Sequence, residues 1–164
     1  MIIACPANRL DEVWRLHRPS HLVSLVSPDT EPLELPGVER LVLRFNDIAE
    51  PRPGLVAPDD ALIRRLLDFA QGWPATEPLA VHCFAGVSRS PAAAYILASA
   101  RAGAGSEGEL ASLLRERSPE ATPNALMISL ADDILGRGGA MRAAIAGIGR
   151  GADAFEGPVF SLPG

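Results

Sequence analysis

The residues best suited to chemistry lie together in segment 82–90, between a predicted strand and a predicted helix. A loop of successive backbone N–H groups that ends at a helix N-terminus binds a phosphate dianion well. Gly86 lets the backbone turn tightly, and Arg89 can place its guanidinium fork on two phosphate oxygens. The segment therefore predicts a phosphate site made of His82, Cys83, Phe84, Ala85, Gly86, Val87, Ser88, Arg89 and Ser90.

Cys83 is the expected nucleophile of this segment. A free thiol has a pKa near 8.5, but a helix N-terminus and nearby positive charge lower the pKa of reactive cysteines to about 3.5–7.5. The resulting thiolate attacks phosphorus far better than a thiol does. We expect Ser90 to donate a hydrogen bond to the sulfur and stabilise it as a leaving group. We expect His82 to hold the Cys83 backbone and to contribute to the low pKa.

The pattern His82-Cys83-x5-Arg89-Ser90 resembles the signature loop of the cysteine-dependent protein tyrosine and dual-specificity phosphatases, H-C-x5-R-[ST]. The resemblance implies a phosphocysteine mechanism, in which Cys83 attacks phosphorus and Arg89 clamps the transferred phosphoryl group. It also implies the fold of that superfamily, in its compact bacterial form. The resemblance extends over roughly residues 21–135, and the signature loop is its specific part.

Ester cleavage also needs a proton for the leaving oxygen. In the resembled family an aspartate on a mobile upstream loop supplies it, and Asp47, 36 residues before Cys83, is the matching position. The sequence here is Phe-Asn-Asp, whereas the tyrosine-specific enzymes have Trp-Pro-Asp, so the loop is more similar to the dual-specificity type. The alternatives are a turn-forming Asn-Asp pair without catalytic duty, and Asp59 or Asp60, which helix capping explains better.

The remaining candidates have weaker signals. Asn124 opens a predicted helix, where it can order a loop or a water, or serve only as a helix N-terminal residue. We favour a structural role for Cys5 over a protective disulfide with Cys83. His17 and His21 have no Cys, Asp or Glu at metal-ligand spacing, so the sequence predicts no metal and no cofactor.

Strands and helices alternate in the first half of the chain, and helices dominate the second half. This order predicts an α/β domain of three layers, with a mainly parallel sheet of four to five strands flanked by helices. The prediction is one phosphatase domain over residues 1–164, in which 136–164 form a C-terminal extension with a weakly ordered glycine-rich part. The expected strands are 2–5, 21–27, 39–45 and 79–82, and the expected helices are 10–17, 59–72, 90–102, 107–116, 122–135 and 140–148.

The composition of the chain argues against nucleic acids and membranes as binding partners. The chain has 164 residues and a net charge of −5, and it has no basic stripe interleaved with aromatics, so nucleic acid is not an expected partner. No apolar run approaches the roughly 18–20 residues that span a bilayer, so we expect no membrane contact. The N-terminus lacks the features of a signal peptide, and two cysteines make no disulfide framework. These observations predict a cytoplasmic protein.

The sequence predicts a phosphatase for phosphotyrosine, with phosphoserine and phosphothreonine as further substrates. Residues 84–88 carry no charge, which makes an inositol-phosphate or lipid substrate the less favoured phosphoester. Two other functions stay open, namely a phosphate-binding module without turnover and sulfur transfer on a rhodanese-like loop. An intact Cys83, Arg89 and Ser90 argue against the first, and the His82-Cys83 pair with an upstream Asp47 argues against the second.

Overall fold

Three strands of the sheet are buried along their whole length, which requires cover on both faces. They are β1 (Ile2–Pro6), β2 (His21–Val26) and β4 (Leu79–Cys83). The computed structural model describes residues 1–164. With the more exposed β3 (Glu39–Arg44) and the C-terminal β5 (Phe160–Leu162), these three strands form a five-stranded sheet in the order β3-β2-β4-β1-β5. The first four strands are parallel, whereas the short β5 runs antiparallel to β1. The predicted α/β class and mainly parallel sheet are confirmed.

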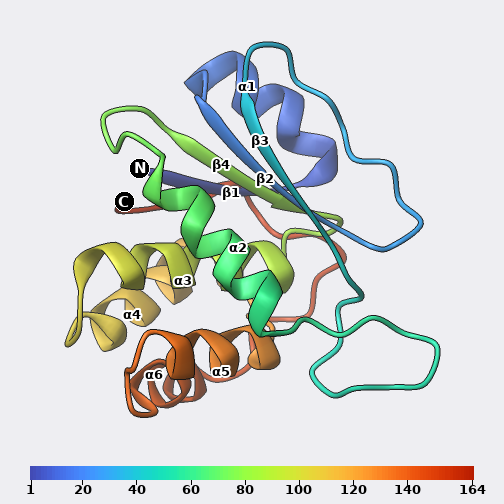
Figure 1. The fold of residues 1–164 in the computed structure, drawn as a ribbon. Coiled ribbons are helices and arrows are strands. Elements are labelled where there is room, and N and C mark those ends of the chain that lie inside the picture. Colours follow the sequence, from blue (N-terminus) through green and yellow to red (C-terminus); the bar gives the residue numbers. More distant parts are fainter.

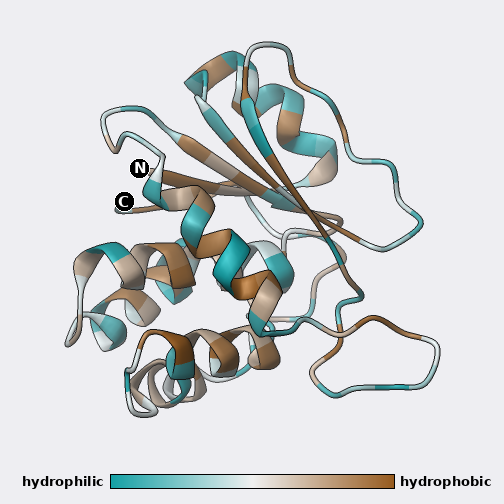
Figure 2. Cartoon of the chain, viewed as in Figure 1, coloured by the Kyte–Doolittle hydropathy of each residue, from teal (hydrophilic) through white to brown (hydrophobic).

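Helices form the two outer layers (Figure 1). On one face, α1 (Leu10–His17) buries Leu10 and Val13 against β1, β2 and β4. The other face carries α2 (Asp60–Gln71), α3 (Arg89–Ala102), α4 (Glu107–Arg117), α5 (Ala125–Ile134) and α6 (Ala140–Ile148). Figure 2 shows hydrophobic residues along the central strands and on the helices beneath them. No helix is long and apolar enough to cross a membrane.

Helix α3 lies innermost on the larger face, between the sheet and the helices α4 and α5. Every residue from Arg89 to Ser99 is buried, and alanine at many of these positions lets the neighbouring backbones approach closely. A helix that is apolar all round is stable only when covered on all sides. The packing therefore fixes the first turn of α3, and with it the end of the preceding loop.

The register of the sheet brings four loops to one end. Pro6 lies opposite Cys83, Ser24 opposite His82 and Val26 opposite Arg44. The loops that follow β2, β3 and β4 therefore leave the sheet at the same end, and so does the loop that precedes the antiparallel β5. In open α/β sheets this carboxyl end is where ligands bind.

Residues 149–159, in the predicted extension, form no helix or strand but make specific contacts. The backbone N–H of Gly151 donates to Thr122 Oγ1 at 3.0 Å, and that of Ala152 donates to the Pro119 carbonyl at 3.0 Å. The chain then adds β5 to the edge of the sheet beside β1. Residues 149–159 are thus held to the rest of the domain by hydrogen bonds near their N-terminal end and by β5 after their C-terminal end.

Candidate active site

The carbonyl groups of the 83–89 loop point away from its centre. The carbonyl oxygens of Phe84, Ala85, Val87 and Ser88 each accept a hydrogen bond from a backbone N–H of another segment. The donors are Ala7 at 3.1 Å, Gly157 at 2.8 Å, Thr122 at 2.8 Å and Asn124 at 3.3 Å, respectively. The N–H groups of the same four loop residues donate no hydrogen bond within the protein. In each peptide group the N–H points opposite to the preceding carbonyl, so the outward carbonyls of Phe84 and Val87 turn the unpaired N–H groups of Ala85 and Ser88 inward, as in a nest for an anion.

Gly86 makes this turn possible. Its φ of +71° lies in the left-handed region, and a Cβ there would lie 2.8 Å from the backbone nitrogen of Pro6. Only glycine fits both the conformation and the close approach to β1. Its N–H donates to the sulfur of Cys83 at 3.3 Å. The glycine therefore brings one backbone donor directly to the nucleophile.

Cys83 ends β4 with its sulfur among hydrogen-bond donors. The Ser90 hydroxyl lies 3.2 Å from Sγ, which, with Gly86, gives a thiolate two donors. Hydrogen bonds to the charged form of a group favour that form. Cys83 is only 3% exposed, but it lines a cavity of about 210 Å³ together with Phe84 and Arg89. The sulfur is therefore reached through this cavity.

Arg89 is a buried cation with unused donors. Its side chain is 5% exposed and forms no ion pair, and one Nη donates to the Phe45 carbonyl at 3.0 Å. The Nε–H has no hydrogen-bond partner. A buried charge is costly unless it is paired. An anion in the cavity that Arg89 shares with Cys83 would supply the missing partner.

His82 does not supply the positive charge that was expected of it near Cys83. It is buried, its Nε2 lies 2.8 Å from Ser24 Oγ, and burial lowers its pKa to about 4. The ring is therefore neutral at pH 7 and adds no positive charge near Cys83. The cost of burying a charged imidazolium outweighs the hydrogen bond with the Cys83 backbone, which would raise the pKa. His82 instead links β4 to β2 directly beneath the loop.

Asp47 contacts the 83–89 loop at Ser88, outside the cavity that Cys83 lines. Its Oδ1 accepts hydrogen bonds from Ser88 Oγ at 2.7 Å and from Asn124 Nδ2 at 2.8 Å. Asn124 Nδ2 also donates to the Ile48 carbonyl at 3.2 Å, while its Oδ1 accepts from the Met127 N–H at the start of α5. The structure thus gives Asn124 two tasks, as helix cap and as a contact that orders the loop carrying Asp47.

The two predicted reacting groups line different hollows. Asp47 lines a groove of about 420 Å³ with Ser88, Asn124 and residues 150–154. The Cys83 cavity is lined on its far side by residues of segment 27–33. Sequence reasoning missed both of these segments, and it had expected the glycine-rich part of the C-terminal extension to be weakly ordered. Asp59 accepts a hydrogen bond from the Leu62 N–H, as expected for a helix cap.

Cys5 is fully buried on β1, opposite His82 in the register. Burial raises the pKa of its thiol to about 12, and the neighbouring Cys83 adds to the effect. The thiol is therefore protonated at neutral pH, which fits a structural cysteine. No group of three or more His, Cys, Asp or Glu side chains is placed to hold a metal ion.

Gly157, in the C-terminal segment, touches the outside of the loop. Its N–H donates to the Ala85 carbonyl, and a Cβ on it would lie 2.6 Å from the Gly86 carbonyl oxygen. The preceding Glu156 accepts a hydrogen bond from Asn8 Nδ2 at 2.6 Å, which holds the segment against the start of the chain. The segment thus supports the loop backbone from behind.

Substituting Gly157→Ala is expected to displace the loop and lower kcat on p-nitrophenyl phosphate by about 10-fold, with an unfolding midpoint only a few degrees lower. The matched control is Gly147→Ala, because a Cβ at Gly147 meets nothing within 4 Å. Steady-state kinetics and thermal unfolding of both variants check the prediction. Equal kcat values for the two variants would show that the contact with Gly157 does not shape the loop.

Comparison with known proteins gives structural matches only. Protein-family models and curated proteins yield no match to the sequence. The human tyrosine phosphatase-like serine/threonine/tyrosine-interacting protein superposes with a TM-score of 0.63 at 18% identity, over 82% of this chain and 91% of that one. Human DUSP28 gives 0.61 at 19%, over 82% and 88%. The fold is that of the dual-specificity phosphatases. PTPMT1 in complex with PI(5)P gives 0.59 at 16%, over 81% and 87%.

Proposed function

We propose that this protein is a cysteine-dependent phosphomonoesterase that hydrolyses phosphotyrosine in proteins, with phosphoserine and phosphothreonine as further substrates. One observation carries the proposal. The unpaired N–H groups of the 83–89 loop and the unpaired Nε–H of Arg89 surround a site that Cys83 lines. Such donors stabilise the negative charge of a transferring phosphoryl group.

In the proposed reaction Cys83 Sγ attacks phosphorus and the bond from phosphorus to the ester oxygen breaks. The leaving oxygen takes its proton from Asp47, while Arg89 and the loop N–H groups hold the phosphoryl oxygens. Water then attacks the thiophosphate and gives a proton to Asp47. The S–P bond breaks, and Ser90 donates a hydrogen bond to the departing thiolate. Inorganic phosphate and the starting enzyme result.

Asp47→Asn is expected to lower kcat by about 10²-fold or more on an alkyl phosphate and much less on p-nitrophenyl phosphate. An alkoxide needs a proton to leave, whereas p-nitrophenolate leaves readily without one. Asp60→Asn is the matched control, since Asp60 lies in the first turn of α2. Wild-type rates for Asp47→Asn on both esters would assign the acid to another group.

Two alternatives to a phosphoprotein phosphatase deserve a test. A non-protein phosphoester, such as an inositol phosphate or a lipid, is suggested by the structural neighbour that binds PI(5)P. The uncharged residues 84–88 favour a substrate with a single phosphate instead. A phosphate-binding module without turnover has the same loop geometry.

We also propose a cytoplasmic location for the protein. Both cysteines are free, which favours a reducing compartment such as the cytoplasm.

The deciding experiment measures release of inorganic phosphate from p-nitrophenyl phosphate, a phosphotyrosine peptide and a phosphoinositide, at a pH of about 5 to 7. We expect turnover of the first two and a much lower kcat/KM for the phosphoinositide. Vanadate binding without any turnover would favour the binding module, and a preference for the phosphoinositide would favour the non-protein substrate.

A further inference from the structure

Large apolar side chains are exposed mainly at the end of the sheet that holds the candidate active site. They lie on the loops after β2, β3 and β4 and on the loop before β5. Met1 and Leu16 are the exposed large apolar residues outside these loops. We call the site-end group the apolar rim, and it consists of Leu33, Leu55, Val56, Phe84 and Phe155.

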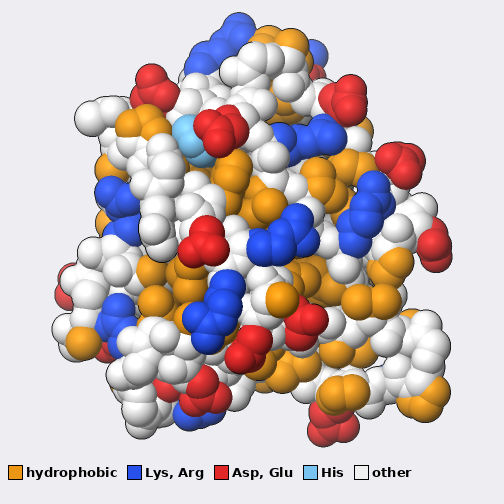
Figure 3. All heavy atoms as spheres, in the orientation of Figure 1, with side chains coloured by type: hydrophobic (Ala, Val, Ile, Leu, Met, Phe, Trp, Pro, Cys, Tyr) orange, Lys and Arg blue, Asp and Glu red, His pale blue; other side chains and the backbone are white.

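The rim residues adjoin the hollows already described. Leu33 and Phe84 line the cavity of Cys83, and Phe84 is 81% exposed although it follows the nucleophile directly. Phe155, fully exposed, follows the segment that lines the groove of Asp47. Figure 3 shows hydrophobic side chains on the lobe at the lower right, which the loop after β3 forms in Figure 1. Exposed apolar groups gathered around a site mark an interaction surface.

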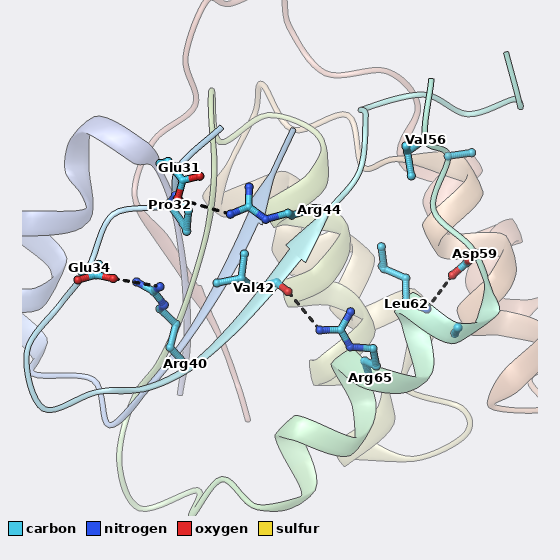
Figure 4. A pocket seen from close by; sticks show the side chains of 12 residues that line it. Glu31, Pro32, Glu34, Arg40, Val42, Arg44, Val56, Asp59, Leu62 and Arg65 are labelled. Atoms are coloured by element: carbon cyan, nitrogen blue, oxygen red, sulfur yellow. Dashed lines mark hydrogen bonds and ion pairs between the residues drawn. The ribbon is translucent and has the colours of Figure 1, made fainter. Parts of the chain in front are cut away.

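A hollow of about 540 Å³ adjoins the cavity that Cys83 lines (Figure 4). Val56 lines this hollow, and Glu31 and Pro32 line both it and the catalytic cavity. Val56 therefore extends the rim along the surface on one side of Cys83, whereas Phe155 lies beside the groove of Asp47. A chain bound with its phosphorylated residue in the cavity would pass over these side chains.

The charges around the rim select among partners. In the hollow, Arg44 faces Glu31 and Arg40 faces Glu34, both at 3.6 Å, so acidic neighbours neutralise these two cations (Figure 4). In the C-terminal loop Arg150 pairs with Asp153. Of the charged groups without an ion pair on these loops and in the hollow, two are arginines, Arg52 and Arg65. The other five are carboxylates, namely Asp29, Asp47, Glu50, Asp59 and Glu156, so negative charge remains in excess. A rim that is apolar and acidic repels an anionic membrane and attracts a partner with apolar and basic side chains.

We propose that the apolar rim docks a protein substrate in which apolar and basic residues flank the phosphorylated residue. This proposal rests on the proposed phosphatase function and adds a sequence preference to it. Leu55, Val56 and Phe155 do not line the Cys83 cavity, so these three side chains should affect a protein substrate and leave small phosphoesters unaffected.

The test compares two phosphotyrosine peptides, one flanked by Leu and Arg and the other by Gly and Glu, with p-nitrophenyl phosphate as the small substrate. The double variant Leu55→Ser, Phe155→Ser removes rim side chains that have no part in the proposed chemistry. Leu16→Ser is the matched control, because Leu16 is 70% exposed on α1. Thermal unfolding of both variants checks that they are folded.

We expect the wild type to prefer the Leu/Arg peptide by about 10-fold in kcat/KM, and the double variant to lose that preference with unchanged activity on p-nitrophenyl phosphate. Leu16→Ser should behave as the wild type. Equal turnover of the two peptides by the wild type would overturn the docking proposal alone. Sedimentation with phosphatidylserine vesicles, lost in the double variant, would overturn it in favour of a membrane surface. Absence of turnover on every substrate would instead contradict the proposed function.

Discussion

Replacing Cys83 by serine is expected to abolish phosphate release, with a loss of more than about 10⁴-fold in kcat. A serine oxygen is a far weaker nucleophile than a cysteine sulfur, so the loop would hold the phosphoryl group without an effective nucleophile to attack it. The fold should persist, because the serine hydroxyl oxygen is smaller than sulfur and can accept hydrogen bonds from the same donors, Ser90 and the Gly86 N–H. Phosphate release from p-nitrophenyl phosphate and thermal unfolding together measure the effect.

Cys5→Ala is the matched control, since it removes the other thiol from the neighbouring strand. Cys5 is fully buried, so this variant should lose stability while it keeps kcat within about twofold. Normal activity of Cys83→Ser would overturn the assignment of the nucleophile. Inactivity of Cys5→Ala in its folded form would show that the second thiol takes part in turnover.

Replacing Arg89 by lysine is expected to lower kcat/KM by about 10³-fold or more, although the positive charge is kept. The guanidinium donates to the Phe45 carbonyl with one Nη and still offers its Nε–H to a ligand. A lysine ammonium has no planar fork, so it cannot hold the backbone carbonyl and two phosphoryl oxygens in one geometry. Kinetics and the inhibition constant of vanadate report the loss.

Arg137→Lys is the control for this substitution. Arg137 is half-buried, with only 8% of its side chain exposed; it likewise donates to a backbone carbonyl, that of Ser99, and it pairs with Glu107 away from the site. Its replacement should lower the unfolding midpoint and leave kcat/KM unchanged. A rate for Arg89→Lys close to that of the wild type would mean that bidentate recognition is not part of catalysis.

The features that follow from short-range sequence were predictable. The parallel strands, the helix that Asp59 caps and the 83–89 loop each have a local signal, such as an apolar run or a residue with one permitted conformation. Asp47 could be proposed from its spacing to Cys83 and Asn124 from its place at the start of a helix, and the structure places Asn124 Nδ2 2.8 Å from Asp47 Oδ1. Their position relative to Cys83 depended on how two loops pack, which spacing alone does not determine.

Contacts between distant segments were not predictable. Residues 149–157 have no periodic pattern, yet Gly157 supports the outside of the loop through a bond to Ala85. The expected charge effect of His82 failed for a related reason. Its pKa falls to about 4 because the fold buries it between neighbouring strands, and the residues adjacent in sequence do not reveal that burial.

A crystal structure with orthovanadate tests the central claim most directly, because vanadate takes the place of the transferring phosphoryl group. The account predicts vanadium bonded to Cys83 Sγ, with its oxygens about 3 Å from the backbone nitrogens of the loop and from the Arg89 guanidinium. Vanadate bound elsewhere, or loop N–H groups turned toward solvent around an unreacted sulfur, would contradict it.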